Sequence, residues 1–262
     1  MTKQNRALLS ELVRTDFKLR YQGSALGYAW SLLSPLLMFA ILYVVFVKFL
    51  RLGNGVPHYP IYLLLGIVIW NFFLEMTMQG TTAIVGRGDL IRKIRIPRWM
   101  IVFSTSLSAL INLGLNLVVV AAFMIFNKVG FLDTLPLLIF PLFEVYVLAL
   151  GMSLLLSALF VKYRDVSYIW QIILQAGFYI TPIIYPLSLI TNVTLQKLIM
   201  INPVAQAIQD ARYAAITHAT TTGSNVFGGG YYKYTPFLIV TAAFFGGLMY
   251  FKSQSKYFAE NI

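Results

Sequence analysis

Two acidic side chains stand inside long apolar runs of this sequence, and they have the plainest potential for chemistry. Glu75 and Glu144 have no lysine or arginine within the runs that surround them. A carboxyl group at such depth is costly, which makes both residues candidates for proton or cation coupling. The alternative is a structural hydrogen bond to a neighbouring helix, and the lack of a basic partner favours it.

Other kinds of reactive site are missing from the sequence. The absence of cysteine excludes disulfides, thiolate metal sites and cysteine nucleophiles. His58 and His218 have no partner at metal-ligand spacing, so we expect no metal site. No Gly-Lys dipeptide occurs, which excludes a phosphate-binding loop of the Walker type. We therefore expect no cofactor on this chain, and the free energy for any transport must come from another chain or an ion gradient.

A strongly basic segment, residues 86–99, separates two apolar runs. Its charged residues are Arg87, Asp89, Arg92, Lys93, Arg95 and Arg98. Asp89 can cap a short helix, which Pro97 would end before the next apolar run. A basic loop beside two membrane spans belongs in the cytoplasm. Composition alone allows two interpretations: the loop only fixes the topology, or a soluble partner docks on it.

The composition is that of an integral membrane protein. Of the 262 residues, 59% are hydrophobic and only 11% are charged, and the mean hydropathy is +0.76. Soluble domains carry about 25% charged residues, so this chain could not cover itself with polar surface. The formal charge of +11 is gathered at the ends of the apolar runs. This distribution indicates membrane topology, and we expect no nucleic-acid partner.

We predict an all-α fold with six transmembrane helices in a single domain, residues 1–262. The predicted spans are residues 27–47, 61–84, 100–126, 136–161, 168–185 and 235–251. Spans of about 20 residues cross a hydrocarbon core of about 30 Å. Residues 4–22 predict an amphipathic helix at the cytoplasmic interface. Both termini are expected in the cytoplasm, because that orientation places most of the 20 basic residues there.

The segment between the last two spans is expected to form short helices outside the membrane. It covers residues 188–216 and is neither a full span nor a plain loop. Within it, Asn202 and Pro203 have the residue types of a helix cap and a first helical residue. Aromatic residues elsewhere make up 15% of the chain. They could line a passage for sugar rings, although core packing is the alternative for each one.

Three stretches together resemble one known family. They are residues 14–37 (RTDFKLRYQGSALGYAWSLLSPLL), residues 90–100 (LIRKIRIPRWM), and residues 181–214, which contain TPIIYPLSLI and INPVAQAIQDARYA. In combination they resemble the membrane subunit of polysaccharide-exporting ATP-binding-cassette transporters. This group moves lipid-linked O-antigen, teichoic acid or capsular polymer. The resemblance extends over essentially the whole chain.

The resemblance implies a transport subunit rather than an enzyme. It implies a homodimer in a bacterial or archaeal plasma (inner) membrane, with two copies of a cytoplasmic ATPase that bind ATP and magnesium. A lipid-linked polysaccharide would enter sideways from the membrane and leave on the external side. Residues 87–98 would form the loop that couples the subunit to the ATPase, and residues 188–216 would form external gate helices.

The resemblance also implies roles for particular residues. The coupling residues would be Asp89, Leu90, Arg92, Lys93, Arg95 and Ile96. The substrate entrance and channel would be lined by Arg20, Tyr28, Trp30, Phe39, Tyr43, Phe178 and Tyr179. The external gate would include Asn202, Pro203, Asp210 and Arg212. It gives no role to Glu75 or Glu144.

Two other functions stay open at this point. One is ATP-driven export of a small hydrophobic drug or lipid by the same type of subunit. The other is a proton-coupled carrier that uses Glu75 or Glu144. A membrane enzyme acting on lipid-linked sugars would need a cluster of catalytic polar groups at one interface, which the sequence does not predict.

Overall fold

The computed structural model describes residues 3–21, 27, 29–53, 55–93, 96–130, 132–228 and 230–258. The side chains of residues 3–6, 17 and 19–21 also lie outside the description. All regular structure in the described residues is helical, and they contain no strand. The predicted all-α fold is confirmed at this level.

Five of the described helices are long and apolar enough to cross a membrane. They are α2 (Ala29–Leu42) with its π-helical continuation η1 (Tyr43–Phe49), α3 (Tyr59–Ala83), α5 (Trp99–Phe126), α6 (Ile139–Lys162) with the preceding η3 (Leu135–Leu138), and α11 (Thr235–Gln254) between η5 (Tyr231–Tyr234) and η6 (Ser255–Tyr257). Their bounds lie within a few residues of five of the six predicted spans. The sequence pattern therefore located these helices well.

The predicted span 168–185 is only partly helical. Its helix, α7 (Val166–Ile180), has 15 residues and is about 22 Å long, which is shorter than a hydrocarbon core of about 30 Å. The chain becomes extended at Thr181, where φ is −74° and ψ is 134°. Thr181 precedes Pro182, and a residue before proline is disfavoured in the helical region. The helix within the predicted span 168–185 therefore ends at Ile180, just before Pro182, one of the two residues expected to interrupt this span.

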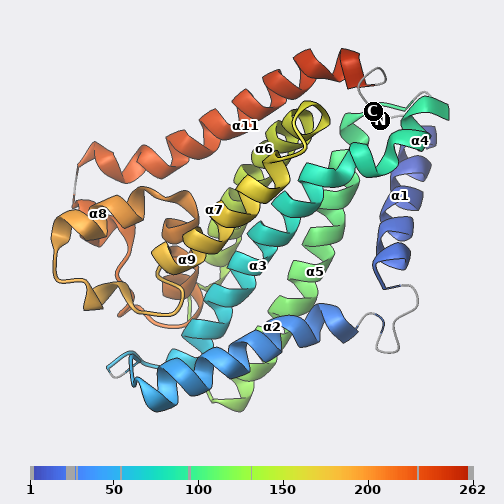
Figure 1. Cartoon of the computed structure of the whole chain (residues 1–262). Helices are drawn as coiled ribbons and strands as arrows, with labels where there is room; N and C mark the ends of the chain where they lie inside the picture. Colours follow the sequence, from blue (N-terminus) through green and yellow to red (C-terminus); the bar gives the residue numbers. More distant parts are fainter. Residues whose placement is uncertain are drawn as a thin grey trace.

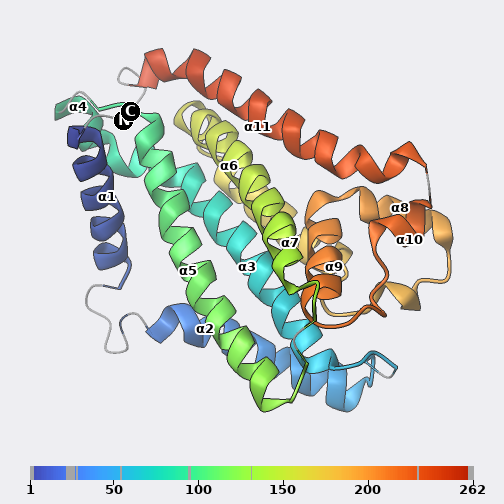
Figure 2. The same cartoon turned by 180° about the vertical axis from the view of Figure 1, so that it is seen from behind.

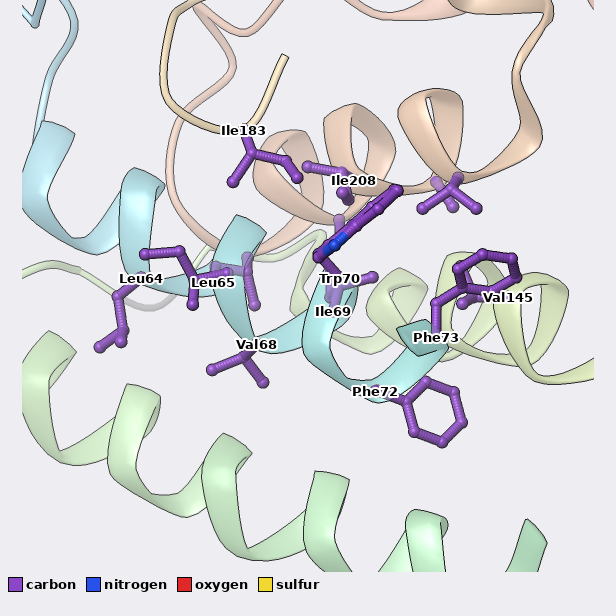
Figure 3. Packing of buried hydrophobic residues seen from close by; sticks show 14 of the residues in the cluster. Leu64, Leu65, Val68, Ile69, Trp70, Phe72, Phe73, Val145, Ile183 and Ile208 are labelled. Carbon is purple, nitrogen blue, oxygen red and sulfur yellow. The ribbon is translucent and has the colours of Figure 1, made fainter. Parts of the chain in front are cut away.

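Helix α3 is the centre of the bundle (Figures 1 and 2). It packs against α2, α5, α6, α7 and α9. In an apolar stretch of 18 residues of α3, 78% of the residues are buried, whereas the corresponding stretches of the other four long helices are 17–44% buried. Figure 3 shows its side chains Leu65, Ile69 and Phe73 beside Ile183, Ile208 and Val145 from other elements. The outer helices leave large apolar sides uncovered, as lipid or a second chain would require.

Small residues let α6 and α11 approach closely. A Cβ atom at Gly247 would collide with the carbonyl group of Gly151 on α6. Between α3 and α6, Ser153 sits against Gly80 and donates a hydrogen bond to the carbonyl oxygen of Met76 at 3.1 Å. Close backbone contact through glycine and serine is the usual way in which membrane helices associate.

Helix α1 (Lys3–Tyr21) runs along one end of α5, and α4 (Gly88–Lys93) lies near the start of α1 (Figure 1). A short 3₁₀ segment, η2 (Val85–Arg87), leads directly into α4. Asp89 is therefore in the first turn of α4 and is not its cap, which corrects the prediction. At this position its negative charge still interacts favourably with the dipole of the helix.

The segment before α11 forms short helices at the opposite end of the molecule from α4 (Figures 1 and 2). They are η4 (Leu187–Leu189), α8 (Val193–Ile201), α9 (Pro203–Ala215) and α10 (Gly223–Phe227). The side chain of Asn202 accepts a hydrogen bond from the backbone N–H of Val204 at 3.0 Å, and Pro203 begins α9. The predicted cap is confirmed.

Candidate functional site

The basic segment 86–99 is tied to α1 and α5 through Arg87. The Arg87 guanidinium forms an ion pair with Asp16 on α1, and both side chains are less than one fifth exposed. Arg87 also donates to the hydroxyl oxygen of Ser104 on α5 at 2.9 Å. Burial lowers the pKa of Arg87, but a guanidinium keeps its charge at neutral pH. This shared contact links three elements, and no residue pattern predicts the pairing of Asp16 with Arg87.

A second contact joins the same segment to α11. Arg98 donates a hydrogen bond to the carbonyl oxygen of Ser255. Ile91 and Ile96 pack on an apolar cluster that includes Phe251 and Phe258. The segment is therefore anchored to the ends of several long helices by apolar and polar contacts.

The residues predicted to couple to a partner divide into two groups. Asp89, Arg92 and Lys93 are exposed, whereas Leu90 and Ile96 are half-buried. The sixth, Arg95, lies outside the described residues. Helix α4 thus turns apolar side chains towards the bundle and charged ones away from it. A short, anchored helix with an exposed charged face has the form of a docking element.

The predicted substrate entrance is described only in part. Trp30 is 42% exposed near the start of α2. Tyr28 and the side chain of Arg20 lie outside the described residues. Trp30 lines a cavity of about 280 Å³ between α2, α3 and α5. The polar residues around this cavity are Ser31, Ser34, Asn71, Glu75, Gln79, Asn112 and Asn116.

Glu75 is part of a hydrogen-bonded polar cluster in this cavity. Its Oε1 accepts from Asn112 Nδ2 on α5 at 2.6 Å and from Gln79 Nε2 at 3.1 Å. Asn116 Nδ2 donates to the carbonyl oxygens of Asn112 at 2.8 Å and Ser31 at 3.3 Å. Glu75 therefore does bond to a neighbouring helix. The signal for these partners was four-residue spacing of amides on α3 and α5, rather than a basic residue.

The aromatic residues predicted to line a channel occupy different environments. Phe39 is buried against Phe123, with ring centroids 5.9 Å apart, and Phe178 is buried against Trp70 at 6.1 Å. These two rings pack inside the chain. Tyr179 is 61% exposed, so it is available to a lumen or a second subunit. Tyr43 is half-buried beside Phe39.

Arg212, predicted to belong to the external gate, is completely buried. Its Nε donates to the carbonyl oxygen of Tyr62 on α3 at 2.9 Å. Nη1 and Nη2 donate to the carbonyl oxygens of Pro182 and Ile183 at 2.6 and 2.8 Å, and Nη1 also reaches Gln209 Oε1 at 3.1 Å. The guanidinium lies 3.6 Å from the ring centroid of Tyr62. Arg212 therefore joins α9, α3 and the segment after α7.

Asp210 points away from this contact. It is half-buried and accepts a hydrogen bond from Gln206 Nε2 at 3.0 Å. Burial raises the pKa of Asp210, and the hydrogen bond from Gln206 partly opposes that effect. Asp210 and Arg212, the two charged residues of α9, therefore contact different parts of the structure. Among the described residues, no group of three or more histidine, aspartate or glutamate side chains could hold a metal ion.

Comparison with known proteins identifies the family. The ABC-2 type transporter family matches residues 7–216. The chain is 30% identical over 203 residues to the O-antigen export system permease protein RfbA of Myxococcus xanthus, a match that covers 76% of each chain. It is 27% and 26% identical over 205 residues to two proteins of the same name from Klebsiella pneumoniae, with 77% of each chain covered. The chain therefore belongs to the ABC-2 type transporter family, as a membrane permease subunit without an ATPase domain.

Proposed function

We propose that this protein is the permease of an ATP-driven exporter that moves a lipid-linked polysaccharide, of the O-antigen or teichoic-acid type, to the external side of the membrane. Family membership and three relatives named as O-antigen export permeases support the substrate class. The observation that carries the mechanism is the anchored, exposed helix α4. It offers a place where a soluble ATPase can push on the bundle.

The contacts of α4 explain how such a push would travel. Arg87 connects the segment to α1 and α5, and Arg98 connects it to the end of α11. A displacement of α4 must therefore carry these helices with it or break these partly buried polar contacts. Such coupling favours movement of rigid bodies between two packed arrangements. The exposed Arg92 and Lys93 would face the ATPase.

The proposed assembly has two copies of this chain and two ATPase subunits, which bind ATP and magnesium. In each copy, α7 together with residues 181–185 makes one crossing in addition to those of the five long helices. Both termini lie in the cytoplasm of a bacterium or archaeon. Several large apolar side chains of α7 are exposed in the single chain, namely Tyr168, Ile169, Ile172, Ile173, Tyr179 and Ile180. A second copy and the lipid part of the substrate would cover this face, while α1 lies at the cytoplasmic interface.

Charge reversal on α4 tests the proposal. The double change Arg92→Glu and Arg95→Glu should remove nucleotide-dependent export and ATPase copurification, because the docking face changes sign. Lys197→Glu with Lys233→Glu is the matched control, since it alters the formal charge equally at the other end of the molecule. Export of polymer and ATPase binding should be measured for both, with the thermal midpoint of the purified chain as the test of folding.

The possible outcomes of these experiments test the docking role of α4 and the substrate class separately. Normal export by the α4 variant would overturn the docking role. A wild-type complex that hydrolyses ATP but moves a small lipid and no polymer would overturn the substrate class alone. A proton-coupled carrier has less support, because Glu75 is hydrogen-bonded to Asn112 and Gln79 and the family match is to ABC transporters. Glu75→Gln should leave ATP-driven export in place.

A further inference from the structure

A second cavity lies at the end of the molecule opposite α4. Its volume is about 540 Å³, and its lining residues come from the start of α6, from α9 and α10, and from the start of α11. Figure 2 shows how these helices are arranged. Two acids, Glu144 and Asp210, line it together with the aromatic rings of Phe140, Tyr213 and Phe237. This combination belongs neither to the coupling segment nor to the polar cavity around Glu75.

The described residues around the two acids of this cavity supply no compensating lysine or arginine. Glu144 is 6% exposed, and its Oε1 has no hydrogen-bond partner. None of the described residues that line the cavity is lysine or arginine. Arg212 lies on the same helix as Asp210, but its guanidinium is directed to Tyr62, Pro182 and Ile183. A buried acceptor without a partner costs free energy, so a donor from outside the chain would be bound favourably.

The mouth of the cavity is apolar. Phe140 and Phe237 are 67% and 45% exposed, and their neighbours Ile139, Phe143 and Leu238 are exposed as well. These side chains lie near the ends of two long apolar helices, where lipid is the expected neighbour. The cavity is also bordered by the polar residues His218, Thr222, Ser224 and Asn225.

We propose that this cavity binds the primary ammonium headgroup of an external-leaflet phospholipid of the ethanolamine type. An ammonium group has three donors and no acceptor, which suits Glu144 Oε1 and the carboxylate of Asp210. Aromatic rings around it add cation–π attraction. The lipid phosphate would meet the polar border of the cavity, and the acyl chains would lie along the exposed apolar residues of α6 and α11.

An amino sugar of an exported polymer offers the same ammonium chemistry, but it would not use the apolar mouth. A divalent cation is less suitable, because the described residues contain no group of three side chains able to hold one. The proposal rests on membership of the membrane family and on the orientation proposed above, and not on which polymer is exported. Failure of polysaccharide export would therefore leave it intact.

Selective lipid retention tests the proposal. The purified chain should be delipidated and mixed with equal amounts of dioleoylphosphatidylethanolamine, dioleoylphosphatidylcholine and dioleoylphosphatidylglycerol in detergent, and bound lipids should be counted by native mass spectrometry. The wild type should retain the ethanolamine lipid over the glycerol lipid by about tenfold, as expected for a charge-assisted hydrogen bond. A chain with formal charge +11 would otherwise favour the anionic lipid.

Variants of the acids supply the decisive comparison. Glu144→Gln and Asp210→Asn should each reduce the preference about tenfold or abolish it, whereas Asp133→Asn, an exposed acid outside the cavity, should leave it unchanged. Phe140→Leu tests the site without removing a buried polar group, and it should weaken retention of the ethanolamine lipid. Equal retention of all three lipids by the wild type would overturn the proposal. So would displacement by glucosamine without any lipid preference, which would indicate a carbohydrate site.

Discussion

The side chain of Arg212 should determine whether alanine is tolerated at position 66. A Cβ atom at Gly66 would collide with Arg212 Nη2 and lie 3.2 Å from Cζ and 3.5 Å from Ile183 Cγ2. The same Nη2 donates to the carbonyl oxygen of Ile183 at 2.8 Å. Gly66→Ala should therefore push the buried guanidinium away from its acceptors, and the effect should disappear when the guanidinium is removed.

The contacts set the size of this effect. Loss of one hydrogen bond from a charged group costs about 1.5–3 kcal/mol, and replacing glycine by alanine within a helix returns about 0.5–1 kcal/mol. Gly66→Ala should thus lower the free energy of unfolding by about 1–2 kcal/mol in the wild type. In an Arg212→Met background it should raise it by about 0.5–1 kcal/mol. The change of sign is the diagnostic result.

The assay is a double-mutant cycle on the purified chain in detergent micelles. Unfolding by sodium dodecyl sulfate, followed by tryptophan fluorescence, would give the four free energies. Arg212→Met alone should be costly, about 3–5 kcal/mol, because it leaves buried carbonyl oxygens unpaired. Gly114→Ala on α5 is the control, since no atom lies within 4 Å of a Cβ at that position, and it should have the same effect in both backgrounds.

The cycle can refute the proposed packing. If Gly66→Ala has the same effect with and without Arg212, the coupling free energy is zero and the guanidinium does not occupy the space beside α3. A coupling of about 2 kcal/mol would support it. Because α9 carries Arg212 and the extended segment supplies two of its acceptors, the same measurement tests how the proposed gate is fixed to the bundle.

Two further predictions concern helix contacts. Gly247→Ala should lower the thermal midpoint by several degrees, because its Cβ would collide with the carbonyl group of the facing glycine on α6, whereas Gly246→Ala, with open space around it, should leave the midpoint unchanged or raise it. Asp16→Asn should increase hydrogen exchange across α1 and lower export, because Arg87 loses its half-buried partner. Asp89→Asn, an exposed change, should alter neither the exchange of α1 nor the thermal midpoint; similar exchange in both variants would contradict the role of the ion pair.

Some parts of this protein follow from local sequence. Long apolar runs bounded by charged residues predict five of the long helices, because the hydrocarbon core requires continuous helices of a minimum length. Asn202 and Pro203 predict the start of α9, because capping depends only on neighbouring residues. The basic segment 86–99 and its exposed Arg92 likewise follow from composition.

Other parts depend on contacts between distant segments. The partner of Arg87 is Asp16, and the acceptors of Arg212 are main-chain carbonyl groups of α3 and of residues 182–183. Main-chain acceptors carry no sequence signature, and residue types alone do not show which acid pairs with Arg87. For Glu75, the four-residue spacing of amides indicates polar faces on α3 and α5, but only the packing of these helices brings Asn112, which is 37 positions away, to Glu75.

The sequence by itself determined that this chain is a helical membrane protein, where most of its long helices lie, and where its charges gather. These features depend on the free energy of placing each residue in water or in hydrocarbon, which is a local property. The tertiary structure alone decided which charged and polar groups are buried together, and that Glu144 and Asp210 share a cavity. Those pairings depend on how the helices pack, because packing sets the distances between groups far apart in the chain.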